Sequence, residues 1–219
     1  MTILHRTRKL LTAGLLAVLL VLSVVLLLGR MPVGVRYGSP SSGLPDAATN
    51  GMDIVSAARK QIGVTVVYDP AYKKIPYPNG DVPRECGVCT DVIIRALRDA
   101  CAVDLQKLVH EDMKANFAKY PQLWGLKKPD TNIDHRRVPN LQCYFKRKGC
   151  SRSVTRKASD YLPGDVVTVM VGGRLPHIML VSDRKAQDGT PLVIHNIGAG
   201  TQEENALFKY PMTGHYRFR

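Results

Sequence analysis

The chain has 219 residues, of which 45% are hydrophobic and 22% are charged, a composition typical of one globular domain with short additional segments. Lysine and arginine outnumber aspartate and glutamate by 31 to 18, so the formal net charge is +13. The positive residues are spread along the chain without an aromatic–basic repeat, so we expect no nucleic-acid partner. An anionic envelope surface is the better match for this positive charge. Alternatively, the charge only keeps a small domain soluble.

The first segment predicts a membrane anchor. Leu10 to Leu28 is an uncharged run long enough to cross a hydrocarbon layer as a helix. No small-x-small cleavage site follows closely, so we expect an uncleaved signal-anchor over residues 1–30. Cleavage, which would release the protein into the periplasm, is the alternative. Basic residues before the run predict a cytoplasmic N-terminus, with the rest of the chain outside the inner membrane.

A linker and one folded domain are predicted after the anchor. Residues 31–50 are rich in glycine, proline and serine, which is typical of a flexible tether. The folded domain is therefore predicted over residues 51–219. No internal repeat is visible, and we expect a monomer.

Helices are predicted in the first part of this domain and strands in the second. The predicted helices are Asp53–Ile62, Cys89 to about Ala100, Asp104 to about Tyr120, and a turn or two at Leu141–Phe145. The predicted strands are Val166–Val171, Ile178–Ser182, Leu192–Asn196 and His215–Phe218, after a short β-prone run at Val64–Tyr68. This order predicts an α+β domain whose helices pack on an antiparallel sheet.

Cys89 is the residue with the strongest functional signal. It follows a turn rich in Pro and Gly and precedes apolar residues spaced along one helical face, so it lies at a helix start. Unpaired backbone N–H groups and the positive end of the helix dipole favour a thiolate there. That is the setting of a nucleophilic cysteine, and a buried, inert cysteine is the alternative.

Two histidines complete a candidate catalytic site. His177 opens one predicted strand and His195 lies in the next, so antiparallel pairing brings them within reach on one face. A thiolate nucleophile needs a base and a third polar group that orients the base. We therefore predict the triad Cys89, His177 and His195. Asn196 points to the opposite face of its strand, so either Asn196 or His195 is the orienting group.

The other cysteines and histidines leave further alternatives open. Outside the cytoplasm, two disulfides are expected among Cys86, Cys101, Cys143 and Cys150, with the pairing undetermined. Cys86 and Cys89 also form a C-x-x-C motif, which makes a dithiol oxidoreductase an alternative function. No spacing typical of a metal site joins the histidines, so we expect no metal and no cofactor, with a zinc hydrolase as the weaker alternative.

The order of these motifs resembles that of the NlpC-type papain-like cysteine peptidases, which cut amide bonds in the stem peptides of bacterial cell walls. The resemblance comes from the helix-start cysteine and from three later stretches: Leu162–Val167, Pro176–Val181 and Val193–Asn196. A closer resemblance, over about Asp53 to Phe218, is to the bacterial family known as domain of unknown function 1287. Its motifs match Gly87–Val92, Asn132–Leu141 and Ile194–Gly198.

The NlpC-type resemblance implies a papain-like core with Cys89 as nucleophile, His177 as base and His195 as orienting residue. In those enzymes an upstream tyrosine lines the oxyanion region, and Tyr77 is the best-spaced candidate here, with Tyr68 behind it.

Two departures from the NlpC-type pattern stand out. Thr90 and Asp91 follow the cysteine where those enzymes have a small residue and glycine, which makes Asp91 a candidate for a local supporting role. The long interval before His177 predicts that Ala100 to Asp160 is an insertion that shapes the substrate cleft.

The sequence therefore predicts a membrane-anchored envelope cysteine hydrolase that cleaves an amide bond in a peptidoglycan stem peptide. A non-catalytic peptidoglycan- or envelope-binding module on the same scaffold is the main alternative, because a fold does not fix its function. The bond cut is left open.

Overall fold

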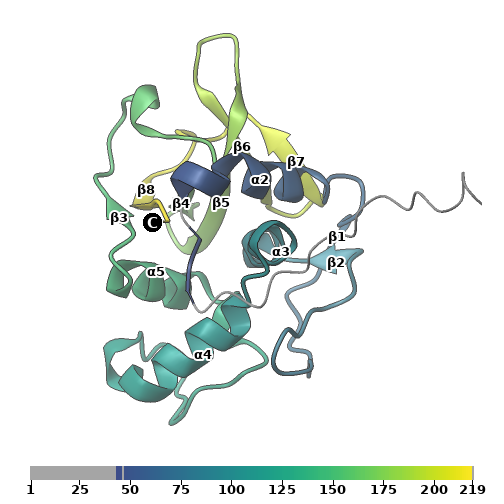
Figure 1. Cartoon of the computed structure of the whole chain (residues 1–219), viewed down its shortest axis with the longest axis vertical. Helices are drawn as coiled ribbons and strands as arrows, with labels where there is room; N and C mark the ends of the chain where they lie inside the picture. Colours follow the sequence, from purple (N-terminus) through teal and green to yellow (C-terminus); the bar gives the residue numbers. More distant parts are fainter. Residues whose placement is uncertain (1–42, 46, 219) are drawn as a thin grey trace, which may run out of the picture. The chain divides into compact units, whose positions relative to one another are not determined.

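The computed structural model describes residues 43–45 and 47–218 (Figure 1). The expected signal-anchor over residues 1–30 and most of the expected linker lie outside the described residues. Among the residues that are described, no helix is long and apolar enough to span a bilayer.

Four α-helices occupy the first two thirds of the described chain. They are α2 (Ala47–Arg59), α3 (Cys89–Cys101), α4 (Leu105–Asn116) and α5 (Val138–Arg147). Helix α3 begins at Cys89 as predicted, and Asp104 caps α4 by accepting a hydrogen bond from the Lys107 backbone N–H at 3.0 Å. Helix α5 starts before the predicted turn because Pro139 lies in its first turn, where proline is tolerated.

A six-stranded antiparallel sheet forms the second layer, with strand order β3-β8-β4-β5-β6-β7. The strands are β3 (Ser151–Arg152), β4 (Val166–Val171), β5 (Leu175–Lys185), β6 (Pro191–Asn196), β7 (Thr201–Glu204) and β8 (Met212–Tyr216). A separate parallel pair joins β1 (Val67–Tyr68) to β2 (Cys86–Gly87). The predicted α+β class, helices with an antiparallel sheet, is confirmed.

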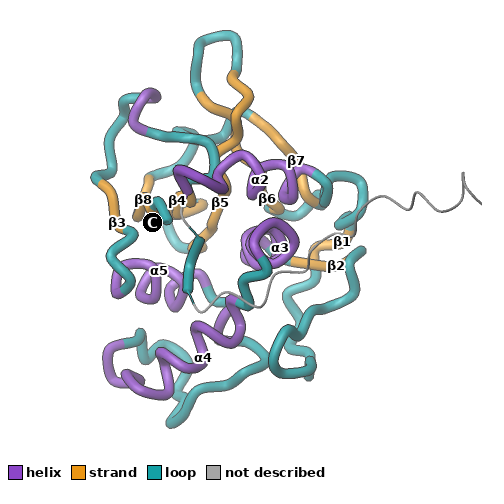
Figure 2. Tube along the Cα trace, viewed as in Figure 1, coloured by secondary structure: helices purple, strands orange, loops and turns teal. Residues whose placement is uncertain are grey.

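The core packs both α2 and α3 against β5 and β6 of the sheet. Ile178 and Leu180 of β5 and Ile194 of β6 pack in one buried cluster with Ile54 of α2 and Ile93 of α3. Figure 2 shows α2 and α3 beside these strands, with α4 and α5 at the lower end of the view. Each fully buried side chain of this size contributes about 1.5–3 kcal/mol, so the cluster fixes the position of the helix that carries Cys89.

The other face of the sheet has its own apolar cover. Met179 and Val181 of β5 and Val193 of β6 pack there against Tyr161 and Leu207, which lie in connecting segments. Alternate residues of β5 and β6 therefore face different clusters, as the period of two requires. Because both faces are covered, the central strands are rigid supports for side chains near their ends.

Cys86, Cys89, Cys101 and Cys143 are free thiols, so the two expected disulfides are not formed. Cys86 lies in β2, Cys101 ends α3, and Cys143 lies on α5, where its Sγ donates to the Lys119 carbonyl at 3.3 Å. The spacing of cysteines along the chain does not show which helices and strands lie close together. In the fold these cysteines lie on different elements and have other neighbours.

Candidate active site

Helix α3 presents Cys89 as its first residue, and a buried ion pair holds that end of the helix in place. Asp91 accepts a hydrogen bond from the backbone N–H of Val88, the N-cap residue, at 2.7 Å. Arg136 donates to both carboxylate oxygens of Asp91, each at 2.9 Å, and both side chains are almost fully buried. Asp91 therefore has a local role, which is to fix the backbone on either side of the nucleophile candidate.

A second buried arginine holds the loop before Cys89 in place. Arg95 of α3 has no exposed surface, and its guanidinium donates to Asp81 at 3.0 Å and to the carbonyl of Cys86 at 2.9 Å. Asn196 of β6 adds a third attachment, because its amide nitrogen donates to the carbonyl of Gly87 at 3.2 Å. Asn196 thus supports the Cys89 loop, and among the described residues its side chain makes no hydrogen bond to either candidate histidine.

The Cys89 sulfur lies near three backbone N–H groups, yet it is a neutral thiol. The amides of Ile178, Thr90 and Cys89 itself lower its pKa, as the helix-start position predicts. Burial acts in the opposite direction and dominates, raising the pKa of the Cys89 thiol to about 12. Only 6% of the residue is exposed. The expected thiolate is therefore not the resting state, because desolvation outweighs the helix terminus.

His177 and His195 form a buried pair across β5 and β6. Nε2 of His177 lies 2.7 Å from Nδ1 of His195, and Nε2 of His195 lies 2.8 Å from Oε1 of Glu204. Burial lowers the pKa of His177 to about 3, with the neighbouring His195 adding to the effect. Burial also lowers the pKa of His195, and the Glu204 carboxylate opposes that shift. Both rings are therefore neutral at physiological pH.

The hydrogen-bond pattern assigns the protons on these rings. The Glu204 carboxylate accepts, so the proton of neutral His195 is on Nε2 and its Nδ1 is an acceptor. His177 must then donate from Nε2, which leaves its Nδ1 with a free lone pair. Nδ1 of His177 is thus the one ring nitrogen of the pair that can accept a further proton.

Cys89 lies next to the strand that carries His177, but the two side chains are not hydrogen-bonded to each other. Within the described chain the sulfur contacts the backbone N–H of Ile178, the residue directly after His177, and no hydrogen bond joins the thiol to the His177 ring. Catalytic hydrogen bonds are often long or poorly aligned before substrate binds, so this geometry leaves the predicted triad open.

Glu204 is a functional candidate that the sequence did not reveal. It ends β7, whose residues Thr-Gln-Glu-Glu are polar and show no apolar alternation. In the sheet, Gln202 pairs with His195, and Glu204 lies two residues further on the same face of β7. The sequence shows only that Gln202 and Glu204 are two residues apart. That this places Glu204 beside His195 follows from the strand register, which the sequence alone does not reveal.

Of the two candidate tyrosines, Tyr68 lines the cleft of Cys89 and Tyr77, which the spacing had favoured, does not. Tyr77 packs edge-on against His110 at a ring-centroid distance of 5.1 Å and is not among the residues that line the cleft of Cys89. Tyr68 does line that cleft, because the β1–β2 pair holds it opposite Gly87. Burial raises the pKa of the Tyr68 hydroxyl, and nearby Cys89 adds to the effect.

The cleft into which Cys89 opens has a volume of about 420 Å³. Its lining includes Trp124 and Arg137 from the segment between α4 and α5, and Arg174 and Pro176 from the start of β5. Residues between Ala100 and Asp160 line this cleft, and their origin as an insertion stays a prediction. Volumes of this size are typical of sites that bind a small molecule or a short peptide.

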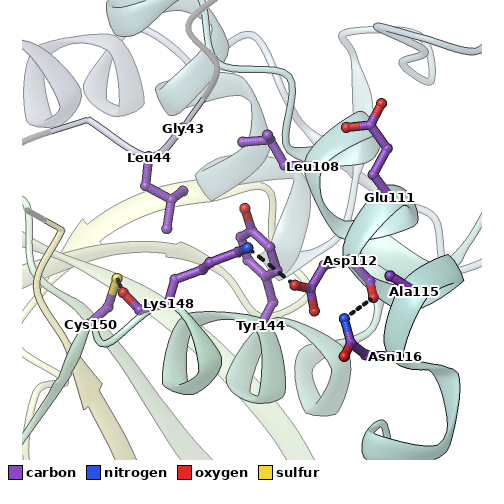
Figure 3. A pocket seen from close by; sticks show the side chains of 10 residues that line it. All are labelled: Gly43, Leu44, Leu108, Glu111, Asp112, Ala115, Asn116, Tyr144, Lys148 and Cys150. Carbon is purple, nitrogen blue, oxygen red and sulfur yellow. Dashed lines mark hydrogen bonds and ion pairs between the residues drawn. The ribbon is translucent and has the colours of Figure 1, made fainter.

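A second cavity, of about 530 Å³, lies between α4 and α5 (Figure 3). Its central carboxylate, Asp112, is already paired with Lys148 at 3.1 Å and with Arg147 at 2.7 Å. Leu44 points into this space from the chain that precedes α2. Because Asp112 is already paired with two basic side chains, this cavity is a weaker candidate for chemistry than the cleft of Cys89. In the part of the chain that the structure describes, no three His, Cys, Asp or Glu side chains gather as metal ligands.

Comparison with known proteins identifies the family. The family model described as "Domain of unknown function (DUF1287)" matches residues 55–218, which include α3, the cleft and the strands that carry His177 and His195. The chain is also 59% identical over 171 residues to "Uncharacterized protein YijF" of Escherichia coli (strain K12), and the alignment covers 78% of this chain and 83% of that relative. The closer of the two sequence resemblances is thereby confirmed, and the chain belongs to the DUF1287 family.

Proposed function

We propose that the protein is a cysteine hydrolase that cleaves an amide bond in the peptide part of peptidoglycan. One observation carries the proposal: Cys89 opens into a cleft at a helix N-terminus, beside the strand on which His177 is hydrogen-bonded to His195 and, through it, to Glu204. Nucleophile, base and orienting groups come in the order that a papain-like mechanism requires.

The reaction starts from a neutral thiol and a neutral imidazole. As substrate enters, the His177 ring turns to bring Nδ1 within reach of the Cys89 sulfur and accepts its proton while the sulfur attacks the carbonyl carbon. The backbone N–H of Cys89 and the hydroxyl of Tyr68 are the candidates to stabilise the oxyanion. His195 and Glu204 stabilise the imidazolium that forms on His177. Its Nε2–H donates to Nδ1 of His195, whose own Nε2–H donates to the Glu204 carboxylate.

The second half of the reaction returns the enzyme to its resting state. The imidazolium protonates the leaving amine as the C–N bond breaks, which leaves an acyl group on the Cys89 sulfur as a thioester. His177 then removes a proton from water, which attacks the thioester carbonyl. The C–S bond breaks, the carboxylic acid leaves, and His177 returns the proton to the Cys89 sulfur. The proposal needs no cofactor, and the substrate supplies both fragments of the cleaved amide.

The proposed location is the periplasmic side of the inner membrane. It rests on the uncharged run from Leu10 to Leu28 and the basic residues before it, which precede the described domain. A membrane-tethered domain in that position meets the stem peptides of the wall as substrate. If the first segment is cleaved instead, the protein acts as a free periplasmic enzyme on the same substrate.

The test is digestion of purified wall fragments with the full chain, followed by mass spectrometry of the products. Wild type is expected to release peptide fragments, and Cys89→Ser is expected to release none while keeping its circular dichroism spectrum. Cys143→Ser is the matched control, because Cys143 is a half-buried thiol on α5 outside the cleft. A Cys89→Ser protein that digests at the wild-type rate would exclude the mechanism.

A binding module on the same scaffold is the second candidate, and the burial of Cys89 favours it. A thiol whose pKa is about 12 is a poor nucleophile at pH 7 unless a base assists it. This candidate predicts that wild type and Cys89→Ser bind wall peptides equally well and that neither changes their mass. The dithiol alternative stays a prediction, since two free thiols at Cys86 and Cys89 are what the reduced form of such a site would have.

A further inference from the structure

Charge in the Cys89 cleft has one sign. Among the described residues, those that line it include three arginines, Arg136, Arg137 and Arg174, and no aspartate or glutamate. The rest of the lining is apolar or aromatic, including Trp124 and Leu123. A cleft with positive groups and apolar walls attracts an anion that also has an apolar part.

These arginines differ in how closely they are paired with carboxylates. Arg136 makes two hydrogen bonds of 2.9 Å to Asp91 and is almost fully buried, so its charge is balanced within the fold. Arg137 has a single, longer contact of 3.3 Å with Asp134. Its guanidinium lies 4.1 Å from the centre of the Trp124 ring, and burial lowers its pKa. Arg137 is therefore a partly desolvated cation that lacks a bidentate partner.

The side chain of Arg174 has no hydrogen-bond or ion-pair partner among the described residues, and only its backbone N–H is bonded, to the Val171 carbonyl at 3.3 Å. It lies in the turn between β4 and β5, three residues before His177, and its side chain is exposed at the rim of the cleft. An arginine fork matches a carboxylate by two parallel hydrogen bonds, and it does so best where water is partly excluded. Arg137 and Arg174 thus line the same cleft from two segments that are 37 residues apart in the sequence.

We propose that Arg137 and Arg174 form a carboxylate-binding subsite, so that the peptide recognised in this cleft carries a free carboxylate close to the bond presented to Cys89. The position of that carboxylate relative to the cut bond rests on the proposed function, whereas the binding itself does not. The subsite selects peptides with an unblocked acidic group over otherwise identical amidated peptides.

The chain provides its own probe for this subsite. Trp124 is the one tryptophan in the sequence, so the intrinsic fluorescence of the full-length protein reports on the cleft. We would titrate the Cys89→Ser protein with a synthetic stem-type peptide bearing free carboxylates and with its fully amidated counterpart, and repeat both titrations calorimetrically. Cys89→Ser removes turnover, so the measurement gives binding alone.

The carboxylate peptide is expected to bind about tenfold or more tightly than the amidated peptide, the range for a hydrogen bond to a charged group. Adding Arg174→Ala is expected to bring the two dissociation constants together. The Arg174 side chain has no hydrogen-bond or ion-pair partner in the described chain, so its loss leaves no buried group unpaired. Arg156→Ala is the matched control, because Arg156 is an arginine that lines a different cavity, and it should leave the preference unchanged.

Three results would overturn the subsite: equal affinities for the two peptides, an Arg174→Ala protein that keeps the preference, or no binding of either peptide. These results are distinct from failure of the proposed function. Cleavage by wild type without carboxylate preference would leave the hydrolase and remove the subsite. Carboxylate-dependent binding without cleavage would leave the subsite and favour the binding module.

Discussion

Nε2 of His177 lies 2.7 Å from Nδ1 of His195, and neither ring has more than 4% of its surface exposed. A hydrogen bond between two neutral rings needs one donor and one acceptor, so the tautomer of either ring fixes that of the other. The outer end of this chain is Glu204, whose carboxylate is partly exposed on β7. A side chain near the surface thereby determines which nitrogen of a buried histidine is free to act as a base.

Replacing Glu204 tests this relay. Glu204→Gln removes the negative charge and allows the amide to donate to His195, which would reverse both tautomers and place a proton on Nδ1 of His177. We expect kcat for peptide cleavage to fall by about 10- to 100-fold with KM little changed, because Glu204 does not line the cleft. The acidic limb of the kcat profile should also shift, as imidazolium is no longer stabilised.

Gln202→Ala is the control for Glu204, since Gln202 lies on the same strand and its side chain donates only to the Ala199 carbonyl. It should leave kcat and its pH dependence unchanged. A Glu204→Gln enzyme with a wild-type pH profile would exclude the positioning role, and an equal loss in both variants would point to general damage to β7.

Acid stability provides a prediction that does not depend on catalysis. Burial lowers the pKa of both His177 and His135 to about 3, from an unfolded value of 6.5. Between these values the unfolded chain binds more protons, so the free energy of unfolding falls as pH drops from about 6.5 towards 3. Each histidine contributes a loss of about 1.4 kcal/mol per pH unit in that window.

Urea midpoints measured from pH 7.5 down to pH 4.5 check this loss. Carboxylates whose pKa is lowered, such as Asp165, destabilise the protein only near and below their unfolded pKa of 3.8, so they do not obscure the upper part of the window. A midpoint that stays constant between pH 6.5 and 4.5 would mean that the two rings are solvated or charged in the folded protein.

Local patterns in the sequence were sufficient for much of the fold. The start of α3 at Cys89 follows from a Pro- and Gly-rich turn before apolar residues at helical spacing, and β4 coincides with its β-branched run between glycines. Strand β7 was missed because a polar Thr-Gln-Glu-Glu segment pairs only by virtue of β6 beside it. Pairing between distant segments was the information that local patterns lacked.

The site shows the same limit. Cys89, His177 and His195 were selected by residue type and order, and their roles stay predictions. The Asp91–Arg136 pair joins residues 45 positions apart, so no local signal indicated it. The thiol was expected to be ionised from its helix terminus alone, whereas its pKa is set mainly by burial, which every packed neighbour contributes to.

The ion pair beneath Cys89 should be one of the most sensitive points of the fold. Asp91→Asn leaves the buried Arg136 guanidinium without a counter-charge, so we expect a loss of about 3–5 kcal/mol in unfolding free energy. Asp99→Asn breaks the exposed pair with Arg84 and should cost less than about 1 kcal/mol.

Chemical denaturation of both variants, with the double variant Asp91→Asn/Arg136→Met, measures the coupling. The double variant should recover part of the loss of the single one, because removing both partners leaves no unpaired charge. Equal effects of Asp91→Asn and Asp99→Asn would show that water reaches the Arg136 guanidinium and that the helix start is less rigidly held than its burial indicates.

The reactivity of Cys89 tests the resting state of the site directly. A rise in pKa from 9.0 to about 12, three units, lowers the thiolate fraction at pH 7 by about a thousandfold relative to an ordinary thiol. Peptide mapping after iodoacetamide treatment should therefore show slow modification of Cys89 at pH 7, rising about tenfold per pH unit up to pH 9. Cys143, which is half-buried, serves as the internal reference and should react faster at each pH.

Rapid, pH-independent labelling of Cys89 between pH 6 and 8, lost in His177→Ala, would instead indicate a preformed thiolate–imidazolium pair. It would contradict the neutral resting state from which the mechanism begins.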